Sequence, residues 1–382
     1  MALNTINKSV QAMLMTPRPA DKTHREYLVK LLGQYYKMLK ESYVDLKQYE
    51  YKFISYAEIL KNVKDICSKL LKVYDLYMQG DVAKSIQVMR DCFTRTDLRL
   101  IEQITSSDIM YRARVIDSTQ CLLDSKSMFH VPVENRSSIA NNRFNISGYP
   151  CLYLGNSILA CWEEMLKPNL EQFYVAQVEL RNKKNKRVID LRWDTSIDSP
   201  RIIEDDGFQG AKKRRVVDFI FRIPLKIACS IPIFEPQLTF KEEYVIPQIL
   251  LLSCIGNKNV DGIAYTSTRR DNQISDDLSL HHNYVFPVQK ITDRGFCEKL
   301  TSDFQITHGV SFMEADIKNV FHGKGTPNIY VENGTLHLDD IDQGKTEYQC
   351  TKFGQMEDYL NTQPRYSLKK IDGKWEEIPI ES

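Results

Sequence analysis

Three residues in the middle of the chain have side chains that could carry out chemistry: Arg143, Tyr153 and Glu164. A guanidinium can bind an anion through two parallel hydrogen bonds, a tyrosine offers an aromatic face with a polar tip, and a carboxylate can stabilise a positive charge that develops during a reaction. Taken singly, each also has a purely structural interpretation, as a loop arginine, a half-buried strand tyrosine and an exposed helix glutamate. Their interest depends on the elements that would position them.

The local sequence predicts a loop, a strand and a helix in succession. Arg143 lies in a polar, turn-rich loop that leads into a short apolar run carrying Tyr153, which is typical of a strand. Asn156 or Ser157 can cap the helix that follows. The three elements would therefore present the three side chains from consecutive parts of one supersecondary unit.

The helix carries two adjacent glutamates, and helical geometry separates them. Glu164 stacks over Ala160 and Cys161, an apolar surface for a carboxylate. Glu163 lies roughly 100° away around the helix, so we expect it to face water. Glu164 is thus the better candidate for a functional carboxylate.

The segment resembles the RES family, whose pattern runs G-R-[FW]-x-x-x-G-x-P, then L-Y-L-x-x-S, then a helix with an acidic residue. The arginine, tyrosine and glutamate of that family are ten and eleven residues apart, as Arg143, Tyr153 and Glu164 are here. Asn142 stands where the family usually has glycine, and Thr266 where it has proline. Further matching blocks follow in the order of the family, at 111–115, 243–248, 261–267 and 283–286, and the resemblance as a whole spans about 185 residues.

The resemblance implies an α+β, ADP-ribosyltransferase-like fold acting on NAD⁺, known in this family as toxins that deplete NAD⁺ or modify a protein. NAD⁺ would be the substrate, with no additional cofactor and no metal. Glu164 would stabilise the oxocarbenium ion that forms as the nicotinamide–ribose bond breaks. Arg143 would contact the pyrophosphate and Tyr153 would stack on a ring or orient it. Arg112 and Ser267 could complete the phosphate or ribose contacts.

Three functions fit this pattern. The first is an NAD⁺ glycohydrolase or phosphorylase that is toxic to its own cell unless restrained. The second is a transferase that places ADP-ribose on a protein or nucleic acid. Such enzymes often carry an acidic or polar residue two positions before the catalytic glutamate, where this chain has Trp162. The third is a non-catalytic binding module in which the N-terminal helices do the work.

The chain divides into three regions of different texture: a helical region at 1–106, the RES-like region at 107–292 and a β-hairpin-rich extension at 293–382. Apolar residues at helical spacing predict helices from residue 24 onwards, with a stop at Gly80 and a new start at Asp81. We expect the N-terminal helices to mediate oligomerisation, docking of an inhibitory antitoxin, or activation. In the extension, Asn333-Gly334 and Asp372-Gly373 predict two tight hairpins.

Short apolar runs predict the secondary structure of the central region. The predicted strands are 110–116, 151–154, 174–180, 188–191, 227–231 and 262–265, and the predicted helices are 158–166 and 245–255. The adjacent pair His281-His282 is interpreted as polar residues of a loop or strand end.

Composition limits the class of protein. Fifty-one Lys and Arg against 50 Asp and Glu give a net charge of +1, which argues against a dedicated nucleic-acid binder. The start of the chain has no apolar signal segment, and no apolar run is long enough to span a bilayer. The nine cysteines include no C-x-x-C pair, so we expect reduced thiols in a cytoplasmic protein without a zinc site.

Overall fold

The computed structural model describes residues 2–47, 50, 55–94, 101–116, 123–181, 184–193, 209–271, 274–275, 277–290, 293–318, 320–321, 329–332, 335–338 and 347–380. The chain forms two compact units. The helical unit comprises Met1–Glu102, Asn142–Ile146 and Ile189–Lys258, and the sheet unit comprises Gln103–Asn141, Ser147–Val188 and Asn259–Ser382. These boundaries differ from the predicted ones, because two segments of the RES-like region pack with the N-terminal helices.

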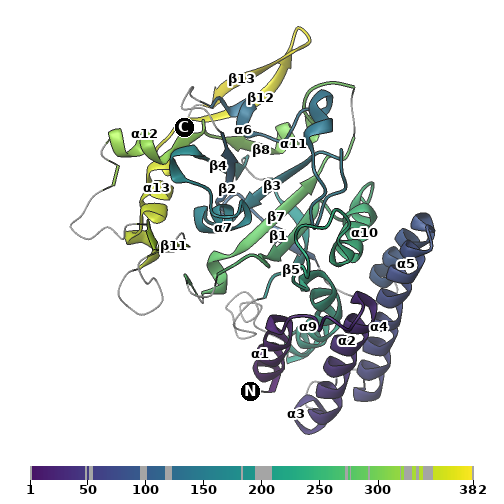
Figure 1. Cartoon of the computed structure of the whole chain (residues 1–382). Helices are drawn as coiled ribbons and strands as arrows, with labels where there is room; N and C mark the ends of the chain where they lie inside the picture. Colours follow the sequence, from purple (N-terminus) through teal and green to yellow (C-terminus); the bar gives the residue numbers. More distant parts are fainter. Residues whose placement is uncertain are drawn as a thin grey trace. The chain divides into compact units, whose positions relative to one another are not determined.

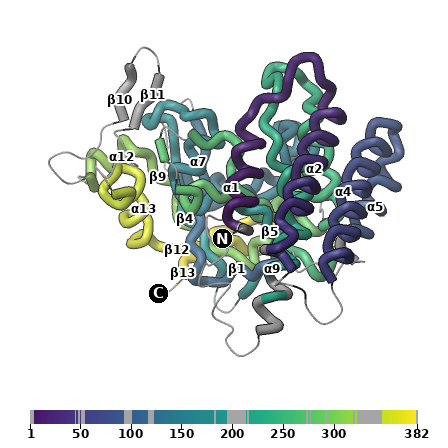
Figure 2. The backbone as a smooth tube through the Cα atoms, turned by 90° about the horizontal axis from the view of Figure 1, so that it is seen from below, coloured from purple at the N-terminus to yellow at the C-terminus, as the bar shows by residue number. Residues whose placement is uncertain are grey.

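The helical unit is built from α-helices of different lengths and one short 3₁₀ turn. They are α1 (Ala2–Met15), α2 (His24–Glu41), α3 (Tyr43–Lys47), α4 (Tyr56–Met78), α5 (Val82–Thr94), α9 (Gln209–Ser230), η3 (Glu242–Tyr244) and α10 (Val245–Cys254). Helix α2 packs between α1 and α4, as Figure 2 shows, and α4 also contacts α5, α9 and α10. The predicted N-terminal helices are therefore confirmed.

Capping residues mark where these helices begin and end. Thr23 and Ser55 precede α2 and α4, and each forms a reciprocal capping box with a glutamate three residues later. Gly80 ends α4 with a φ of 84°, and Asp81 accepts a hydrogen bond from the amide of Lys84 at the start of α5. The predicted stop and restart at this point are correct.

One predicted strand is wrong. Residues 227–230 form the last turn of α9 rather than a strand. Their apolar character reflects burial on all sides, since Ile227, Ala228 and Cys229 are each at most 3% exposed. A short, uniformly apolar run fits a buried helix end as well as a buried strand, so periodicity could not separate the two.

The sheet unit is centred on antiparallel strands in the order β6-β7-β3-β2-β4-β8-β12-β13, with β9 paired to β4 (Figure 1). Their bounds are β2 (Met110–Val115), β3 (Cys151–Gly155), β4 (Phe173–Leu180), β6 (Gly262–Thr266), β7 (His282–Pro287), β8 (Phe304–Ile306), β9 (Val310–Ser311), β12 (Arg365–Ile371) and β13 (Lys374–Ile380). Two further strands, β1 (Ile101–Ile104) and β5 (Lys186–Leu191), contain two of the points where the chain passes from one unit to the other. The chain is thus α+β, as predicted.

Short helices cover this sheet and connect its strands. They are α6 (Ser125–Met128), η1 (Val133–Ser138), α7 (Ile158–Glu164), η2 (Leu170–Gln172), η4 (Leu278–Leu280), α11 (Glu298–Asp303), α12 (Phe312–Ile317), η5 (Tyr348–Cys350) and α13 (Lys352–Asn361). Of these, α7 contacts β2, β3 and β7, and α13 packs against α7.

The two faces of the sheet have separate cores. On one face, Leu152 and Leu154 of β3 pack with Phe286 of β7. On the other, Tyr111 of β2 packs with Trp162 of α7, together with apolar residues of α13. Alternation along each strand therefore decides which side chains lie beneath α7.

The C-terminal region is part of this sheet rather than a separate appendage. Strands β8 and β12 extend the order beyond β4, and α13 lies against α7. The predicted hairpin at Asp372-Gly373 is confirmed, with φ angles of 47° and 81°. Strands β10 (Ile329–Glu332) and β11 (Thr335–Leu338) also pair antiparallel, whereas the predicted turn residues Asn333-Gly334 lie outside the described residues.

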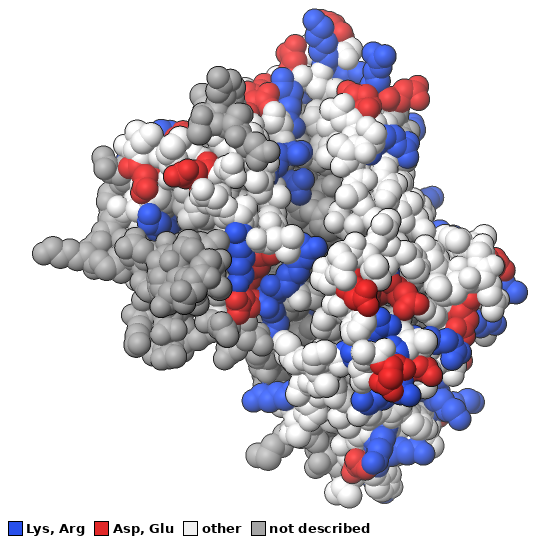
Figure 3. Space-filling model, viewed as in Figure 1, with Lys and Arg blue, Asp and Glu red and all other residues white. Residues whose placement is uncertain are grey.

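The surface shows no separation of charge on the face in view. Figure 3 shows side chains of both signs interspersed there, in keeping with the near balance of acidic and basic residues. No helix among the described residues combines the length and the apolar character needed to cross a membrane.

Candidate active site

Helix α7 carries both glutamates, and its first turn is fixed by side chains. Ser157 accepts a hydrogen bond from the amide of Ala160 (2.9 Å) and donates one to the carbonyl of Leu280 (2.5 Å). The amide of Ile158 donates to Oε1 of Glu357, which belongs to α13 (2.7 Å). Ser157 is thus the N-cap, one of the two residues expected for that role.

The carboxylate of Glu164 lies at the end of α7, held by side chains from two other segments. Its Oε1 accepts hydrogen bonds from Oγ of Ser267 (2.6 Å) and Nδ2 of Asn283 (2.8 Å). Nε of Arg269 lies 3.8 Å from Oε2 of Glu164, and Nη1 of Arg269 donates a hydrogen bond to the Glu164 carbonyl. The Glu164 side chain remains 27% exposed, so the held carboxylate is accessible to a ligand.

Glu163 is buried, contrary to the prediction that it faces water. Its Oε2 lies 2.7 Å from Nδ1 of His281, and neither side chain has any exposed surface. Its Oε1 accepts a hydrogen bond from the amide of Asp271 (2.8 Å). The prediction failed because this last turn is covered by the segment after β6, which includes Asp271, and by His281, the residue just before β7.

Tyr153 lies on the face of the sheet that α7 covers. Its strand neighbours Leu152 and Leu154 pack into the opposite core, so alternation directs Tyr153 to the α7 side. Tyr153 pairs with Val285 across β3 and β7, and the next pair on that face is Gly155 with Asn283. The structure therefore brings Tyr153 and the Glu164 ligand Asn283 to the same face of neighbouring strands.

Gly155 allows α7 to approach β3 closely. A Cβ atom at this position would lie 2.7 Å from Sγ of Cys161, too close for any side chain. Cys161 in turn donates to the carbonyl of Tyr111 in β2 (3.4 Å). The close contact fixes the distance of α7 from the sheet, and with it the height of Glu164 above the strands.

The Arg112 side chain supports β3 by binding the backbone of that strand. Met110 and Arg112 lie on one face of β2 and Tyr111 on the other, because side chains alternate along a strand. Met110 packs in the core that contains Leu152 and Leu154, so the Arg112 side chain lies on the face of the sheet opposite to Tyr153. Its guanidinium donates to the Tyr153 carbonyl (3.1 Å), and burial lowers its pKa to about 10. Arg114 shares this face, as expected, and binds the carbonyl of Phe129 (2.9 Å).

Arg143 belongs to the helical unit, whereas the other predicted site residues belong to the sheet unit. It is buried, at 7% exposure, and donates to the carbonyl of Cys229 (3.1 Å). Its guanidinium also lies 5.3 Å from the ring centroid of Tyr244 in η3. Asn142 and Asn145 on either side exchange two backbone hydrogen bonds, and Gln248 donates to both of their carbonyls (2.9 and 3.0 Å).

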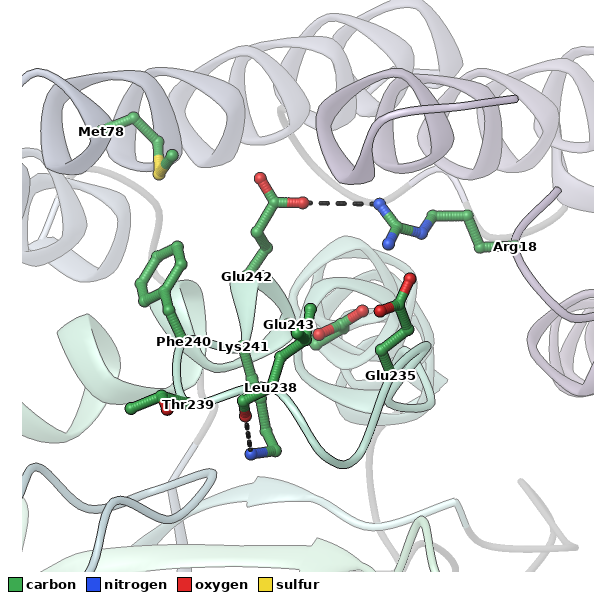
Figure 4. A pocket seen from close by; sticks show the side chains of 9 residues that line it. All are labelled: Arg18, Met78, Glu235, Leu238, Thr239, Phe240, Lys241, Glu242 and Glu243. Carbon is green, nitrogen blue, oxygen red and sulfur yellow. Dashed lines mark hydrogen bonds and ion pairs between the residues drawn. The ribbon is translucent and has the colours of Figure 1, made fainter. Parts of the chain in front are cut away.

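The helical unit also contains a cavity of about 390 Å³ beside η3 (Figure 4). Glu235, Glu242 and Glu243 contribute carboxylates to its wall, and Arg18 pairs with Glu242 (3.4 Å). Tyr74 of α4 donates to the other oxygen of Glu242 (2.8 Å). None of the five predicted site residues lines this cavity.

Sequence reasoning missed Asn283, Arg269 and the buried pair Glu163–His281. Asn283 is a buried polar residue beside the apolar run 284–287 of β7, a pattern that marks a buried amide with a specific partner. His281 and Arg269 carried no such signal, because only the fold brings their segments to the end of α7. Among the described residues, no three metal-ligating side chains gather into a group.

The chain is 28% identical over 325 residues to a protein of Bacillus subtilis (strain 168) named "Putative toxin YopC". That alignment covers 79% of this chain and 69% of YopC. No family model matches the chain, and no solved structure matches it.

Proposed function

We propose that this chain is a toxin-like enzyme of the RES type that cleaves the nicotinamide–ribose bond of NAD⁺, with Glu164 as its catalytic carboxylate. The observation that supports this most is the setting of Glu164. It stands eleven residues after Tyr153, is accessible to a ligand, and is held by Ser267 and Asn283. The two donors to Oε1 are neutral, and the Arg269 guanidinium stands 3.8 Å from Oε2, beyond hydrogen-bond distance, so the carboxylate can still face a cation on the substrate.

The reaction needs little acid catalysis. When the bond between ribose C1′ and the pyridinium nitrogen breaks, its electron pair stays on nitrogen and neutral nicotinamide leaves. Glu164 stabilises the oxocarbenium ion that remains, a contribution of about 3–4 kcal/mol for a single preorganised group. Attack by water then yields ADP-ribose and a proton, whereas attack by phosphate yields ADP-ribose that carries a phosphate at the same C1′.

The remaining site residues bind and orient the substrate. The partly exposed Arg269 is assigned to the pyrophosphate, because a guanidinium matches its oxygens with paired donors. Arg143 keeps the pyrophosphate role that the resemblance to the RES family implies. Tyr153 is assigned to a ring of NAD⁺. Arg112 has a supporting part in this proposal, since its guanidinium binds the carbonyl of Tyr153.

Trp162 favours hydrolysis or phosphorolysis over transfer to a macromolecule. It occupies the position where transferases often carry a polar residue, two before the glutamate. Its ring is fully buried, and its indole N–H donates to the carbonyl of Pro168 (2.9 Å). A side chain committed in this way leaves no group at that position to engage an acceptor protein.

The similarity to YopC supports a toxin-like function, which we extend to depletion of cellular NAD⁺ and restraint by an inhibitory partner. Induced expression of the wild-type chain is expected to lower the NAD⁺ content and arrest growth. Glu164→Gln is expected to restore both. Arrest without any loss of NAD⁺ would contradict this part of the proposal.

The decisive experiment incubates purified protein with NAD⁺, with and without phosphate, and follows free nicotinamide. The wild-type chain should release it, and Glu164→Gln should not. Glu171→Gln is a matched control, because Glu171 is an exposed glutamate of η2 in the same unit. Absence of release by wild type, or equal release by Glu164→Gln, would refute the function. ADP-ribose attached to a macromolecule would favour the transferase.

A further inference from the structure

The fully buried pair formed by Glu163 and His281 is the least expected feature near Glu164. The carboxylate and the imidazole are both shielded from solvent, 2.7 Å apart. Burial of a carboxylate is costly unless it is paired and hydrogen-bonded. A well-packed apolar pair of similar size is often as stable, so stability alone does not account for this pair.

The pair ties α7 to the segment that holds Glu164. We call residues 267–271 the clasp loop. Its first residue, Ser267, binds Oε1 of Glu164, and its last residue, Asp271, donates its amide to Glu163. The two glutamates therefore anchor opposite ends of the same loop.

His281 connects Glu163 to the first residue of the clasp loop. Its carbonyl accepts a hydrogen bond from the amide of Ser267 (2.8 Å), while its ring binds Glu163. Two residues further on, Asn283 binds Glu164. The ring of contacts thus runs from Glu163 through His281 to both side chains that fix Glu164.

The backbone after α7 is strained, which is consistent with a helix end held in place. Leu166 and Lys167 have φ angles of 64° and 54°, in the left-handed region that non-glycine residues avoid. The ammonium of Lys167 lies 2.5 Å from the carboxylate of Asp271, so the strained turn is also tied to the clasp loop.

We propose that Glu163 and His281 are a positioning pair that fixes the Glu164 carboxylate relative to its donors Ser267 and Asn283. This inference rests on the proposed function, in which Glu164 acts on the ribose. Glu163 and His281 act through Glu164 and contact no substrate. Of the two adjacent glutamates, Glu163 then serves to position the site and Glu164 takes part in the reaction.

The test compares Glu163→Gln, His281→Asn and the double variant with wild type by steady-state nicotinamide release. Misplacing a reacting group by about 1 Å costs up to about a hundredfold, so kcat should fall at least about tenfold. KM should change much less than kcat, because neither Glu163 nor His281 contacts the substrate. The double variant should lose no more than the worse single variant, since both break the same ring of contacts.

Glu171→Gln again serves as the control, and thermal unfolding of every variant sets a temperature at which all are folded. If Glu163→Gln does not fold, His281→Asn decides the question. Wild-type kcat in both single variants would overturn the inference and leave the proposed function standing. So would additive losses or a rise in KM equal to the fall in kcat. An inactive wild-type chain would remove the proposed function and this inference together.

Discussion

Arg143 and Glu164 are held by different kinds of contact in the two units. Arg143 binds a backbone carbonyl and an aromatic ring, and its turn is closed by backbone hydrogen bonds. Glu164 is held by the side chains of Ser267 and Asn283, with Arg269 beside it. Backbone contacts survive most substitutions, whereas side-chain contacts are lost one at a time. We therefore expect the sheet unit to be sensitive at single positions and the helical unit to respond mainly through packing.

The largest expected effects come from substituting Glu164 and Arg143 themselves. Glu164→Gln should lower kcat about a hundredfold or more with little change in KM, because it removes stabilisation made only in the transition state. Arg143→Lys should instead raise KM about tenfold, because a lysine loses the paired donors that match a pyrophosphate. Steady-state kinetics of nicotinamide release measure both, and identical kinetic signatures would remove the distinction between the units.

The next effect concerns the donors of Glu164. Asn283→Ala removes one of the two hydrogen bonds to Oε1, and kcat should fall about tenfold, equivalent to about 1.4 kcal/mol. The measurement is again kcat, with Glu171→Gln as the control. Full activity in Asn283→Ala would mean that Ser267 alone fixes the carboxylate.

A smaller effect on activity is expected in the helical unit. Gln248→Ala leaves the carbonyls of Asn142 and Asn145 without their side-chain donor, which should lower the free energy of unfolding by about 1–3 kcal/mol. Activity should change only through KM, and by a few-fold, since Arg143 keeps its bond to the Cys229 carbonyl. Chemical denaturation and kinetics on the same samples test this. A selective loss of kcat would show that the Arg143 turn also controls the chemistry.

The smallest expected effect is on how the free energy of unfolding of each unit depends on pH. Burial raises the pKa of Glu357 to about 7, so its stabilising contribution is full below the ordinary glutamate pKa and is lost as the pH rises towards 7. Glu357→Gln should flatten that decline when unfolding free energy is measured against pH. In the helical unit, burial lowers the pKa of His24, so its contribution is lost as the pH falls. An unchanged pH profile in Glu357→Gln would assign the decline to another group.

Much of the fold could be predicted because the elements carry local signals. Glycine and aspartate at 80 and 81 mark a helix boundary, and Asp372-Gly373 marks a hairpin. Residues 227–230 could not be predicted, since their uniform burial erased any periodicity.

The candidate site was predictable in part, for a related reason. Tyr153 and Glu164 lie on consecutive elements, so spacing alone could connect them. Asn283 of β7 and His281, just before that strand, come more than a hundred residues later in the chain, and only the pairing of β7 with β3 places them beside α7. The error over Glu163 has the same origin, because a helical wheel records the faces of a helix but not what covers them.

The hydrogen bond between Glu357 and the amide of Ile158 has a consequence for the synthesis of the protein. The helix that carries Glu164 receives this partner only when a residue almost two hundred positions further along the chain has been made. At about 5–20 residues per second, a ribosome needs roughly 10–40 s to cover that distance. During that interval the nascent chain has its arginine, tyrosine and glutamate but an incompletely supported α7. The helix that carries Glu164 is therefore fully supported only after most of the chain has been made.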